Sequence, residues 1–404
     1  MLEIQGKYNK AKVYTDTIDS SAVGLLTALL NQECIKGSQV RIMPDVHAGK
    51  GCVIGTTMTI KDKVIPNIVG SDIGCGVLVV KLKERRLDYT KLDSYIRKEV
   101  AVVRKKEHSR VDKLDLDELK CNKGSLKSVR LGFATLGGGN HFIEIDKDED
   151  GDLYLLIHTG SRSLGTQVAV YYQDLAFQEA ILRENGGTLE EKLSLIRGKF
   201  TDKELKKQED LIRKGYKRVG DVPYELAYVT GKSYTDYVHD MKITQEYARL
   251  NRRTIADMIL SGMKLHETES FDTIHNYIDL EDNIVRKGSV SAKAGEKLII
   301  PINMRDGALL CIGKGNADWN YSAPHGAGRF LSRAEAKASI SVSDFKQTMK
   351  EAKVFTTCVG RATVDESPFA YKDIQTILSN VKDTVDIVSR LTPVYNFKGG
   401  TEDD

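Results

Sequence analysis

The sequence predicts an α+β fold in which mixed β-sheets are layered with helices. Short apolar segments bounded by glycine-rich turns recur along the chain, as expected of β-strands. Between His158 and Glu267 the sequence changes to long, charged stretches with helical periodicity. The strands come in groups and do not alternate strictly with helices, which argues against a Rossmann-type sheet.

Six segments are predicted as strands: Gln39–Met43, Val77–Leu82, Leu153–His158, Leu298–Pro301, Ala308–Ile312 and Val354–Thr357. Side chains alternate along the second of them as in a strand near a sheet edge. One helical face is predicted from residues at spacings of three, seven, seven and four: Val238, Met241, Ala248, Ile255 and Ile259. A second amphipathic helix is predicted near the C-terminus from Ile374, Ile377, Val381, Val385 and Val388.

Neither a linker rich in proline and serine nor an internal repeat divides the chain, so we expect one domain over residues 1–404 with a helix-rich excursion at about 165–265. The lysine- and arginine-rich segment Arg197–Arg218 is expected to be a solvated helical face. The small acidic tail Gly399–Asp404 is expected to be frayed.

Composition is that of a soluble globular protein, with 41% hydrophobic and 29% charged residues in 404. The formal net charge of +3 excludes a bulk electrostatic attraction for nucleic acid, so RNA binding would need a local basic patch. The apolar stretch Ala22–Leu30 is too short to span a bilayer, and no export signal opens the chain. We expect a cytoplasmic protein without a membrane partner.

Six cysteines lack any CxxC pair and are spaced irregularly for a disulfide framework. In a reducing compartment most of them are expected to be small buried hydrophobic residues. Cys75 is the exception, because Asp72 and Cys75 stand three residues apart in a turn flanked by glycines. Gly74 and Gly76 allow the backbone to turn both side chains toward one point.

Five of the eight histidines lie in short strings flanked by glycine or asparagine that look unlike helix or strand interiors: His47, His141, His158, His275 and His325. His108, His239 and His266 lie among charges in helical sequence and are expected to be structural. Cys, His and Asp form a borderline-soft ligand set that suits zinc, manganese, iron or cobalt better than magnesium or calcium. The sequence therefore predicts a transition-metal site.

Two glycine-rich segments are candidates for contact with phosphate. Gly137-Gly138-Gly139 can present backbone N–H groups to an anion. His325-Gly326-Ala327-Gly328-Arg329 precedes a helical stretch, and Arg329 and Arg333 would share a helix face as a phosphate clamp. A histidine beside such a cradle can be a general base or a nucleophile, and the spacing does not decide between them.

Taken in order, these strings resemble the RtcB family of GTP-dependent RNA ligases from about residue 40 to Lys398. The resemblance rests on Pro44–His47 with Gly49–Gly51, Asp72–Gly76, Gly139–Glu144, His158–Arg162, His275-Asn276, Arg286–Gly288, His325–Arg329 and Ala370–Asp373.

The resemblance implies a set of roles. Cys75 would bridge two Mn²⁺ ions, with Asp72 and His141 completing one shell and His158 and His275 the other. His325 would take GMP from GTP and pass it to an RNA 3′-phosphate, which a 5′-hydroxyl then attacks; 2′,3′-cyclic phosphates would be opened first. Asp45 and His47 would support the site. GTP or GMP would be held by Asn140, Glu144, Asn303, Gly326, Ala327, Gly328, Tyr371 and Lys398. RNA ends would be gripped by Arg162, Arg329 and Arg333.

The chain departs from the commoner family pattern at two places. Ile302-Asn303-Met304 stands where many members have Gly-Ser-Met, and Pro324 precedes His325 where cysteine or serine is more usual. Alternatives are an enzyme that only caps RNA 3′-ends with GMP, a dinuclear metal phosphoesterase and a non-enzymatic RNA-binding module. The modest basicity and the lack of stacking-aromatic motifs argue against the last.

Overall fold

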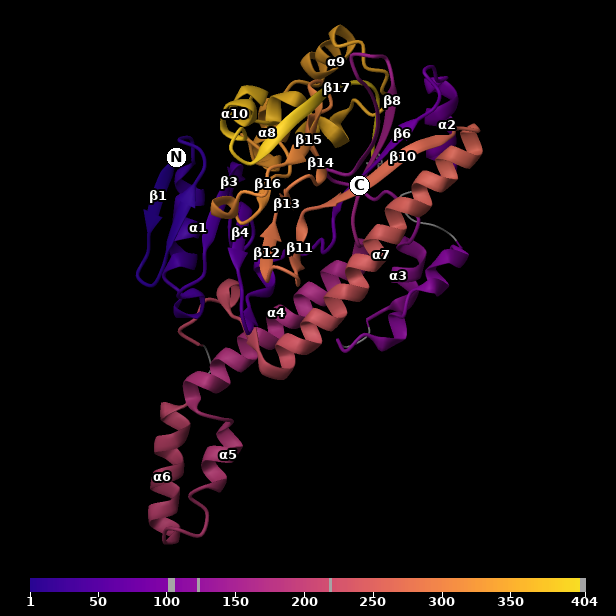
Figure 1. Cartoon of the computed structure of the whole chain (residues 1–404). Coiled ribbons are helices and arrows are strands. Elements are labelled where there is room, and N and C mark those ends of the chain that lie inside the picture. The colour runs from indigo at the N-terminus through magenta and orange to yellow at the C-terminus, as the bar shows by residue number, and fades with distance from the viewer. Residues whose placement is uncertain (101–105, 122–123, 218–219, 400–404) are drawn as a thin grey trace.

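The structure, a computed structural model, describes residues 1–100, 106–121, 124–217 and 220–399. Two large sheets form the body, and helices cover them (Figure 1). The smaller sheet has six strands, and its neighbours pair antiparallel except for the parallel pair β2–β3. In spatial order they are β1 (Leu2–Gln5), β2 (Lys10–Val13), β3 (Val40–His47), β4 (Ile54–Thr59), β12 (Ile284–Lys287) and β11 (Asn276–Asp279).

The larger sheet has seven antiparallel strands. In spatial order they are β10 (Glu267–Ile274), β6 (Gly76–Leu82), β8 (Leu153–Thr159), β7 (Phe142–Lys147), β17 (Val385–Lys398), β15 (Gly307–Gly313) and β14 (Lys297–Asn303). The long strand β17 pairs with β15 along its first half and with β7 along its second, so it joins the two parts of the sheet. Two small ladders pair β13 (Ser289–Ser291) with β16 (Ser322–Pro324) and β5 (Lys63–Val64) with β9 (Val229–Thr230).

Helices are concentrated in the middle of the chain and near its C-terminus. They are α1 (Ser20–Leu30), α2 (Tyr89–Glu99), α3 (Leu126–Gly132), α4 (Arg162–Asn185), α5 (Leu189–Ser194), α6 (Asp202–Gly215), α7 (Gly231–Met263), α8 (Arg333–Ser339), α9 (Val342–Glu351) and α10 (Ile374–Asn380). Helices α4 and α7 pack together along the body, and α5 and α6 project from it (Figure 1). No helix in the described ranges is long and apolar enough to cross a bilayer.

The larger sheet separates two parts of the hydrophobic core. Leu78 and Val80 of β6 face a cluster that includes Ile255 and Ile259 of α7. Val77, the preceding residue, faces the opposite cluster. The predicted alternation is therefore present in β6, which lies next to the edge strand β10, and both faces of the strand are buried.

The predicted α+β class is confirmed, and five of the six predicted strands correspond to β3, β6, β8, β14 and β15. The sixth prediction is wrong. In Val354–Thr357 only Phe355 forms a bridge, to Tyr395 of β17, because the chain touches the sheet there for a single residue. His47 is the last residue of β3, and His158 is the next-to-last residue of β8, in agreement with the predicted strand Leu153–His158.

The helical middle is confirmed, since helices α4 to α7 lie between Arg162 and Met263. Met241, Ala248, Ile255 and Ile259 share the buried face of α7, whereas Val238, predicted on the same face, is only half-buried. The C-terminal helix is correct only to Asn380. Val385 and Val388, expected to continue it, belong to β17, because that segment pairs with β15 in the sheet. Here tertiary pairing overrides a helical spacing.

Helix α6 has no buried residue, which confirms a solvated face for most of Arg197–Arg218; Arg218 itself lies outside the described residues. The prediction for the tail also concerns residues outside them, apart from Gly399. No disulfide joins cysteines within the described residues, and Cys52, Cys121 and Cys311 are buried as expected. Cys34 and Cys358 are only half-buried.

Candidate active site

The predicted metal ligands meet at one end of the larger sheet. Gly76, the first residue of β6, lies opposite Thr159 of β8 and opposite Ile274 of β10. Phe142, the first residue of β7, pairs with His158. This register brings together Cys75 and His141, which directly precede β6 and β7, and His275, which directly follows β10. His158, the next-to-last residue of β8, and Asp72, in the turn before β6, complete the set.

A tight turn before β6 points Asp72 and Cys75 the same way. Gly74 has φ +72°, a conformation that favours glycine, and the Cys75 amide donates to the Asp72 carbonyl at 3.2 Å. A Cβ on Gly160 would lie 2.2 Å from Oδ1 of Asp72, so only glycine lets the carboxylate approach β8. Asn276 donates from its side chain to the Asp72 carbonyl, which anchors the turn to β11.

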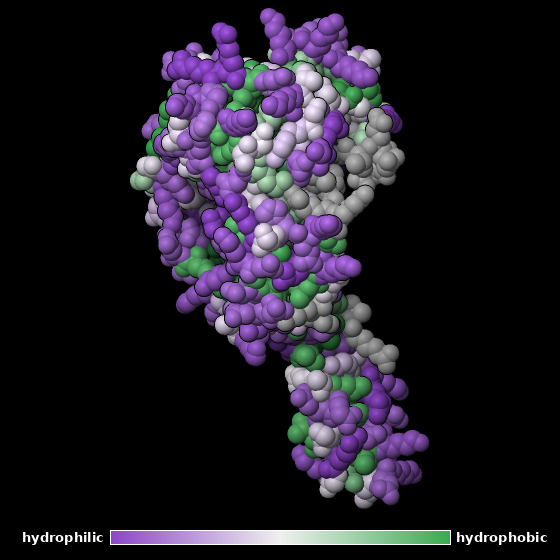
Figure 2. Space-filling view, turned by 90° about the vertical axis from the view of Figure 1, so that its right-hand side faces the viewer, coloured by the Kyte–Doolittle hydropathy of each residue, from purple (hydrophilic) through white to green (hydrophobic). Residues whose placement is uncertain are grey.

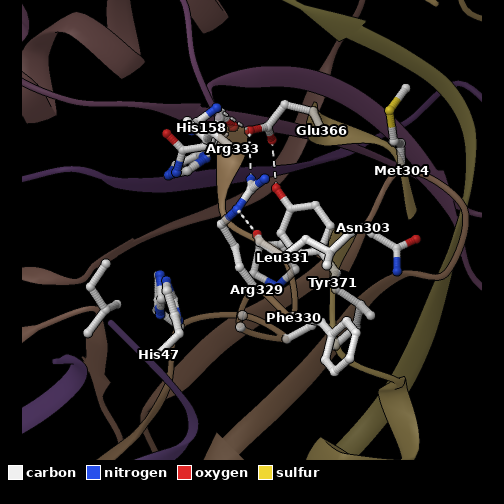
Figure 3. A pocket seen from close by; sticks show the side chains of 18 of the residues that line it. His47, His158, Asn303, Met304, Arg329, Phe330, Leu331, Arg333, Glu366 and Tyr371 are labelled. Carbon is white, nitrogen blue, oxygen red and sulfur yellow. Dashed lines mark hydrogen bonds and ion pairs between the residues drawn. The ribbon is translucent and has the colours of Figure 1, made fainter. Parts of the chain in front are cut away.

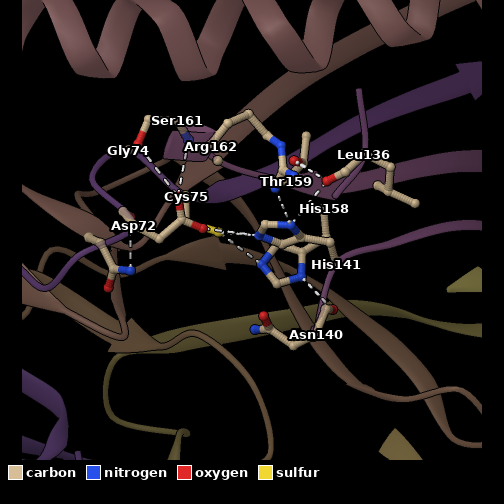
Figure 4. Close-up of polar contacts among 12 residues, drawn as sticks. Asp72, Gly74, Cys75, Leu136, Asn140, His141, His158, Thr159, Ser161 and Arg162 are labelled. Carbon is tan, nitrogen blue, oxygen red and sulfur yellow. Dashed lines mark hydrogen bonds and ion pairs between the residues drawn. The ribbon is translucent and has the colours of Figure 1, made fainter. Parts of the chain in front are cut away.

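The five side chains form two groups of three that share Cys75. Figure 4 shows four of the five: Asp72, Cys75, His141 and His158. Sγ of Cys75 lies 3.6 Å from Nε2 of His141 and 3.3 Å from Nε2 of His158. In each group, Asp72–Cys75–His141 and Cys75–His158–His275, the ligand atoms lie within 4.8 Å of one another. The arrangement could hold two cations bridged by one sulfur.

Proton positions within this cluster favour a bound cation. Nδ1 of His141 faces the Leu136 carbonyl at 3.0 Å and Nδ1 of His158 faces the Asn140 carbonyl at 3.2 Å, so both rings carry hydrogen there and turn Nε2 toward the sulfur. A Cys75 thiol carries one hydrogen, so it can donate a hydrogen bond to only one of these two Nε2 atoms. Nε2 of His141 also lies 3.0 Å from the Asp72 carboxylate, an arrangement that needs a second ring proton or a cation.

Burial and neighbouring charge dominate the electrostatics of the cluster. Burial and the Asp72 carboxylate raise the pKa of the Cys75 thiol well above its usual value. Burial, together with neighbouring positive groups, lowers the pKa of His158 and of His275 well below 6.5. Neutral imidazoles are the form that binds metal, and a coordinated cation stabilises the thiolate that burial disfavours. The donor set therefore fits a borderline-soft divalent metal.

A buried arginine beneath the cluster was not predicted. Arg252 of α7, 0% exposed, donates to the carbonyls of Gly74 and Thr159, which precede Cys75 and follow His158. Its other nitrogens bind both oxygens of Asp272 at 2.6 Å. The preceding residue, Asn251, donates to the Gly160 carbonyl. Arg252 is one of several arginines in a charged helical segment, so no local pattern distinguishes it in the sequence.

His325 follows β16 and lies beside the cluster, with its ring 4.8 Å from the ring of His275. Its Nδ1 lies 2.6 Å from Oδ2 of Asp45, and its backbone amide donates to the same oxygen at 3.1 Å. Asp45 is 0% exposed, and its Oδ1 has no hydrogen-bond partner among the described residues. The carboxylate thus holds hydrogen on Nδ1 and leaves Nε2 of His325 with a lone pair.

Two cavities adjoin His325. One of about 240 Å³ is lined by the metal-ligand candidates Asp72, Cys75 and His275. The other, of about 780 Å³, extends toward the C-terminal region and is of the size that a nucleotide requires (Figure 3). It is lined by all the residues predicted to hold the nucleotide: Asn140, Glu144, Asn303, Gly326, Ala327, Gly328, Tyr371 and Lys398. His325 and Asn140 line both cavities.

Glu366, which the sequence did not single out, organises one wall of the larger cavity (Figure 3). Its Oε2 accepts from the Tyr371 hydroxyl at 2.6 Å and from Nζ of Lys398 at 3.1 Å. Its Oε1 accepts from Arg333 and Arg329 at 2.7 and 3.2 Å. Burial by itself raises the pKa of Glu366, but the charges of Lys398, Arg333 and Arg329 lower it below 4.5.

Arg329 and Arg333 do not share a helix face as predicted. Arg329 precedes α8 and forms a bridge with Tyr371, whereas Arg333 is the first residue of the helix. The two guanidinium groups nevertheless converge on Glu366, because the chain folds back before the helix begins. The side chain of Arg333 is 45% exposed and that of Arg329 14%, so Arg333 is the more accessible cation.

The glycine-rich loop lies between two arginines. A Cβ on Gly137 would lie 1.7 Å from a guanidinium nitrogen of Arg162, and one on Gly139 would lie 3.7 Å from Arg333. Arg162, the first residue of α4, has φ +56°, an uncommon conformation for a residue with a side chain. Loop amides and both guanidinium groups make this rim attractive to anions.

Other predicted residues have partners of their own. Glu144 accepts from the Asn396 amide at 2.5 Å, and burial raises its pKa to about 7. Asn303 is engaged in a turn, since its amide donates to Asp306 and its oxygen accepts the Asp306 backbone amide. His47 turns Nδ1 to the Asp45 carbonyl at 2.9 Å, and burial lowers its pKa to about 4.

The three histidines expected to be structural lie outside the site. His108 accepts the Arg110 amide at the start of a short 3₁₀ helix. His239 faces Asp240, and His266 faces Glu84 at 2.7 Å. None of the three lines either cavity described above.

Comparison with known proteins identifies the family. A family model described as tRNA-splicing ligase RtcB matches residues 29–123 and 92–399. RNA-splicing ligase RtcB1 and RNA-splicing ligase RtcB, both of Escherichia coli, the latter from strain K12, are each 30% identical to this chain over 404 residues, covering 89% of it and 90% of the relative. The tRNA-splicing ligase RtcB of Aeropyrum pernix is 27% identical over 467 residues, with 91% and 90% coverage. The chain therefore belongs to the RtcB family.

Proposed function

We propose that the protein is an RNA ligase that joins an RNA 3′-phosphate, or a 2′,3′-cyclic phosphate opened by water, to a 5′-hydroxyl end with GTP. Residues 1–404 would act as one catalytic domain. One observation carries the proposal: His325, oriented by buried Asp45, stands between a Cys/His/Asp cluster and a cavity of about 780 Å³. The family membership and the names of the relatives support it.

The metal would be a pair of Mn²⁺ ions. Cys75 would bridge them, Asp72 and His141 would bind one, and His158 and His275 the other. Bound cations neutralise phosphate oxygens and lower the pKa of a coordinated hydroxyl. Arg252 and Asn276 would keep the ligand-bearing turns in place through their carbonyl contacts.

His325 would act as the nucleophile. Asp45 accepts the Nδ1 hydrogen, so the Nε2 lone pair attacks the α-phosphorus of GTP, and the bond to the β-phosphate oxygen breaks to release pyrophosphate. An RNA 3′-phosphate oxygen then attacks the phosphorus of the histidine–GMP, which frees His325 and leaves a 3′-diphosphate-linked guanosine end. Attack of the 5′-hydroxyl on the RNA phosphorus forms the phosphodiester, releases GMP and loses the hydroxyl proton.

Guanine would bind where Glu144, Tyr371 and Lys398 line the larger cavity. Glu366 keeps the last two in place, since its carboxylate bonds to both. Asn140 and the amides of Gly326–Gly328 would contact phosphates. Because the Asn303 side chain already serves a turn, its contact with the nucleotide would need that turn to open.

The RNA ends would bind beside the glycine-rich loop, between Arg162 and Arg333. Arg333 is half-exposed and bonds to Asp365 and Glu366, so its cationic side chain is preoriented. Arg329 is held more deeply, by the Glu366 carboxylate and the Asp365 backbone carbonyl, and would support Arg333. An anionic 3′-phosphate suits this positive rim better than a neutral hydroxyl does.

The first test incubates the full chain with Mn²⁺ and GTP labelled at the α-phosphate. Label is expected on the parent and on the control His266→Ala, whose ring is exposed and lines neither cavity. His325→Ala is expected to stay unlabelled, and the linkage should resist alkali and break in acid, as a P–N bond does. Labelled His325→Ala would overturn the assignment of the nucleophile.

The second test offers the parent enzyme RNAs with each pair of ends. Joining of 3′-phosphate to 5′-hydroxyl is expected, and joining of 3′-hydroxyl to 5′-phosphate would refute the proposed chemistry. Accumulation of 3′-guanylylated RNA without joining would instead identify an end-capping enzyme. Hydrolysis of phosphoesters without any GTP-dependent labelling would identify a metal phosphoesterase.

A further inference from the structure

The helical arm, defined here as residues 186–217 with α5 and α6, stands clear of the body of the protein (Figures 1 and 2). It forms neither cavity of the candidate active site. Helix α6 is 14 residues long without a buried residue, and α5 packs against it. A helix that projects this far and buries so little adds little to the core, which suggests a role in binding.

Helix α6 separates apolar from basic side chains. Leu205 and Ile212 are half-buried and lie on one side of the helix. At 100° per residue, the opposite side carries five exposed cations. These residues, the basic strip, are Lys203, Lys206, Lys207, Arg213 and Lys214.

Charge in the basic strip is largely uncompensated. Asp210 is the only acid that falls within the strip. None of the five cations forms an ion pair within the described part of the chain, whereas Arg197, nearer the tip of the arm, is paired with Glu190. The arm has nine basic and six acidic residues, an excess of three that equals the net charge of +3 of the whole chain. The rest of the protein is thus neutral on balance, and positive charge is concentrated on the arm.

Dimensions and chemistry fit a nucleic-acid backbone. Lys214 is eleven positions after Lys203, which is about 16 Å of helix, the length over which one strand of a duplex presents about five phosphates. At the tip, Phe200 is 41% exposed next to Lys199, and an exposed aromatic ring beside a cation can stack on an unpaired base. A hydrophobic partner is a poorer match, because eight of the ten exposed residues of α6 are charged and Leu211 is the one large apolar side chain exposed on this helix.

We propose that the basic strip of α6 binds the phosphate backbone of the RNA substrate at a distance from the ends that are joined. The inference rests on the proposed function, because it takes RNA as the substrate. The arm would add affinity for long or structured RNA, while the chemistry at His325 and the binding of short ends would not need it. RNA of sufficient length would touch the body and the arm at once, and the two contacts would reinforce each other.

The test compares two triple variants of the full chain with equal changes of charge. Lys203→Glu/Lys207→Glu/Lys214→Glu reverses the strip, and Lys36→Glu/Lys346→Glu/Lys350→Glu reverses three exposed lysines elsewhere. Anisotropy at several salt concentrations measures binding of a long hairpin RNA and of a six-nucleotide RNA, both with 3′-phosphates. Labelling by GTP is measured in parallel.

For the strip variant we expect the Kd for the hairpin to rise at least about tenfold. The slope of log Kd against log salt concentration should correspond to about two to three fewer counterions released on binding. Binding of the short RNA and labelling should match the parent, and the control variant should match it throughout. Hairpin binding equal to that of the control variant would overturn the inference, as would equal weakening for long and short RNA. If the parent itself is not labelled, the proposed function fails, whatever the arm does.

Discussion

Replacement of Asp45 by asparagine is expected to slow the transfer of GMP to His325 without removing the metal. Oδ2 of Asp45 bonds to both Nδ1 and the backbone amide of His325, at 2.6 and 3.1 Å, and the carboxyl group is 0% exposed. The negative charge also stabilises the positive ring that forms when Nε2 attacks phosphorus. An amide supplies neither the charge nor a guaranteed orientation.

Asparagine has two ways to fit, and each one impairs His325. If its oxygen faces Nδ1, the NH₂ group takes the place of Oδ1, which has no hydrogen-bond partner among the described residues. A buried donor is then left unsatisfied at a cost of about 1–3 kcal/mol. If the NH₂ group faces Nδ1 instead, hydrogen moves to Nε2, and the nucleophilic lone pair is lost.

Loss of a charge-assisted hydrogen bond of about 1.5–3 kcal/mol corresponds to labelling that is about 10- to 150-fold slower. Single-turnover labelling with GTP and Mn²⁺ measures this rate, and metal analysis with thermal unfolding verifies that the site and the fold persist. His266→Gln is the control, because its exposed ring pairs with Glu84 and lines neither cavity. Labelling of Asp45→Asn within about threefold of the parent would refute the argument.

Three further variants test the metal ligands and the buried charges. Cys75→Ala should lose most of both metals, because the sulfur of Cys75 belongs to both groups of three. The control Cys311→Ala should retain the metals. Undiminished metal content of Cys75→Ala, measured by mass spectrometry, would exclude the bridge. Arg252→Lys keeps the positive charge but loses the several N–H donors of the guanidinium group, so metal affinity should fall about 10- to 100-fold and the free energy of unfolding by about 3 kcal/mol. The control Arg249→Lys, at an exposed position of the same helix, should change neither quantity. Glu366→Gln should lower the free energy of unfolding by about 2–4 kcal/mol near neutral pH. Because the pKa of Glu366 is lowered in the folded protein, this difference should be full above pH 4.5 and shrink as the pH falls below it; a difference that stays constant down to pH 3 in denaturant titrations would contradict the assignment.

Local sequence was enough to predict several features because they depend on neighbouring residues. The face of α7 follows from apolar spacing, and the turn at Asp72–Cys75 follows from the need for glycine at position 74. Prediction failed where a segment's structure depends on a distant partner. Val385–Val388 has a helical spacing, yet it forms a strand because β15 offers a pairing edge.

The sequence by itself determined which side chains have the chemistry for a metal centre, a nucleophile and a phosphate rim, and which family they resemble. Only the tertiary structure decided their partners. Asp45 meets His325 across 280 residues, and Glu366 gathers Arg333 and Lys398 from separate segments. Such pairs depend on sheet register and on how the chain folds back, and no local pattern encodes either. The same holds for the arm, whose basic residues are visible in the sequence, whereas only the structure shows that α6 projects away from the body and that these residues form no ion pair in the described part of the chain.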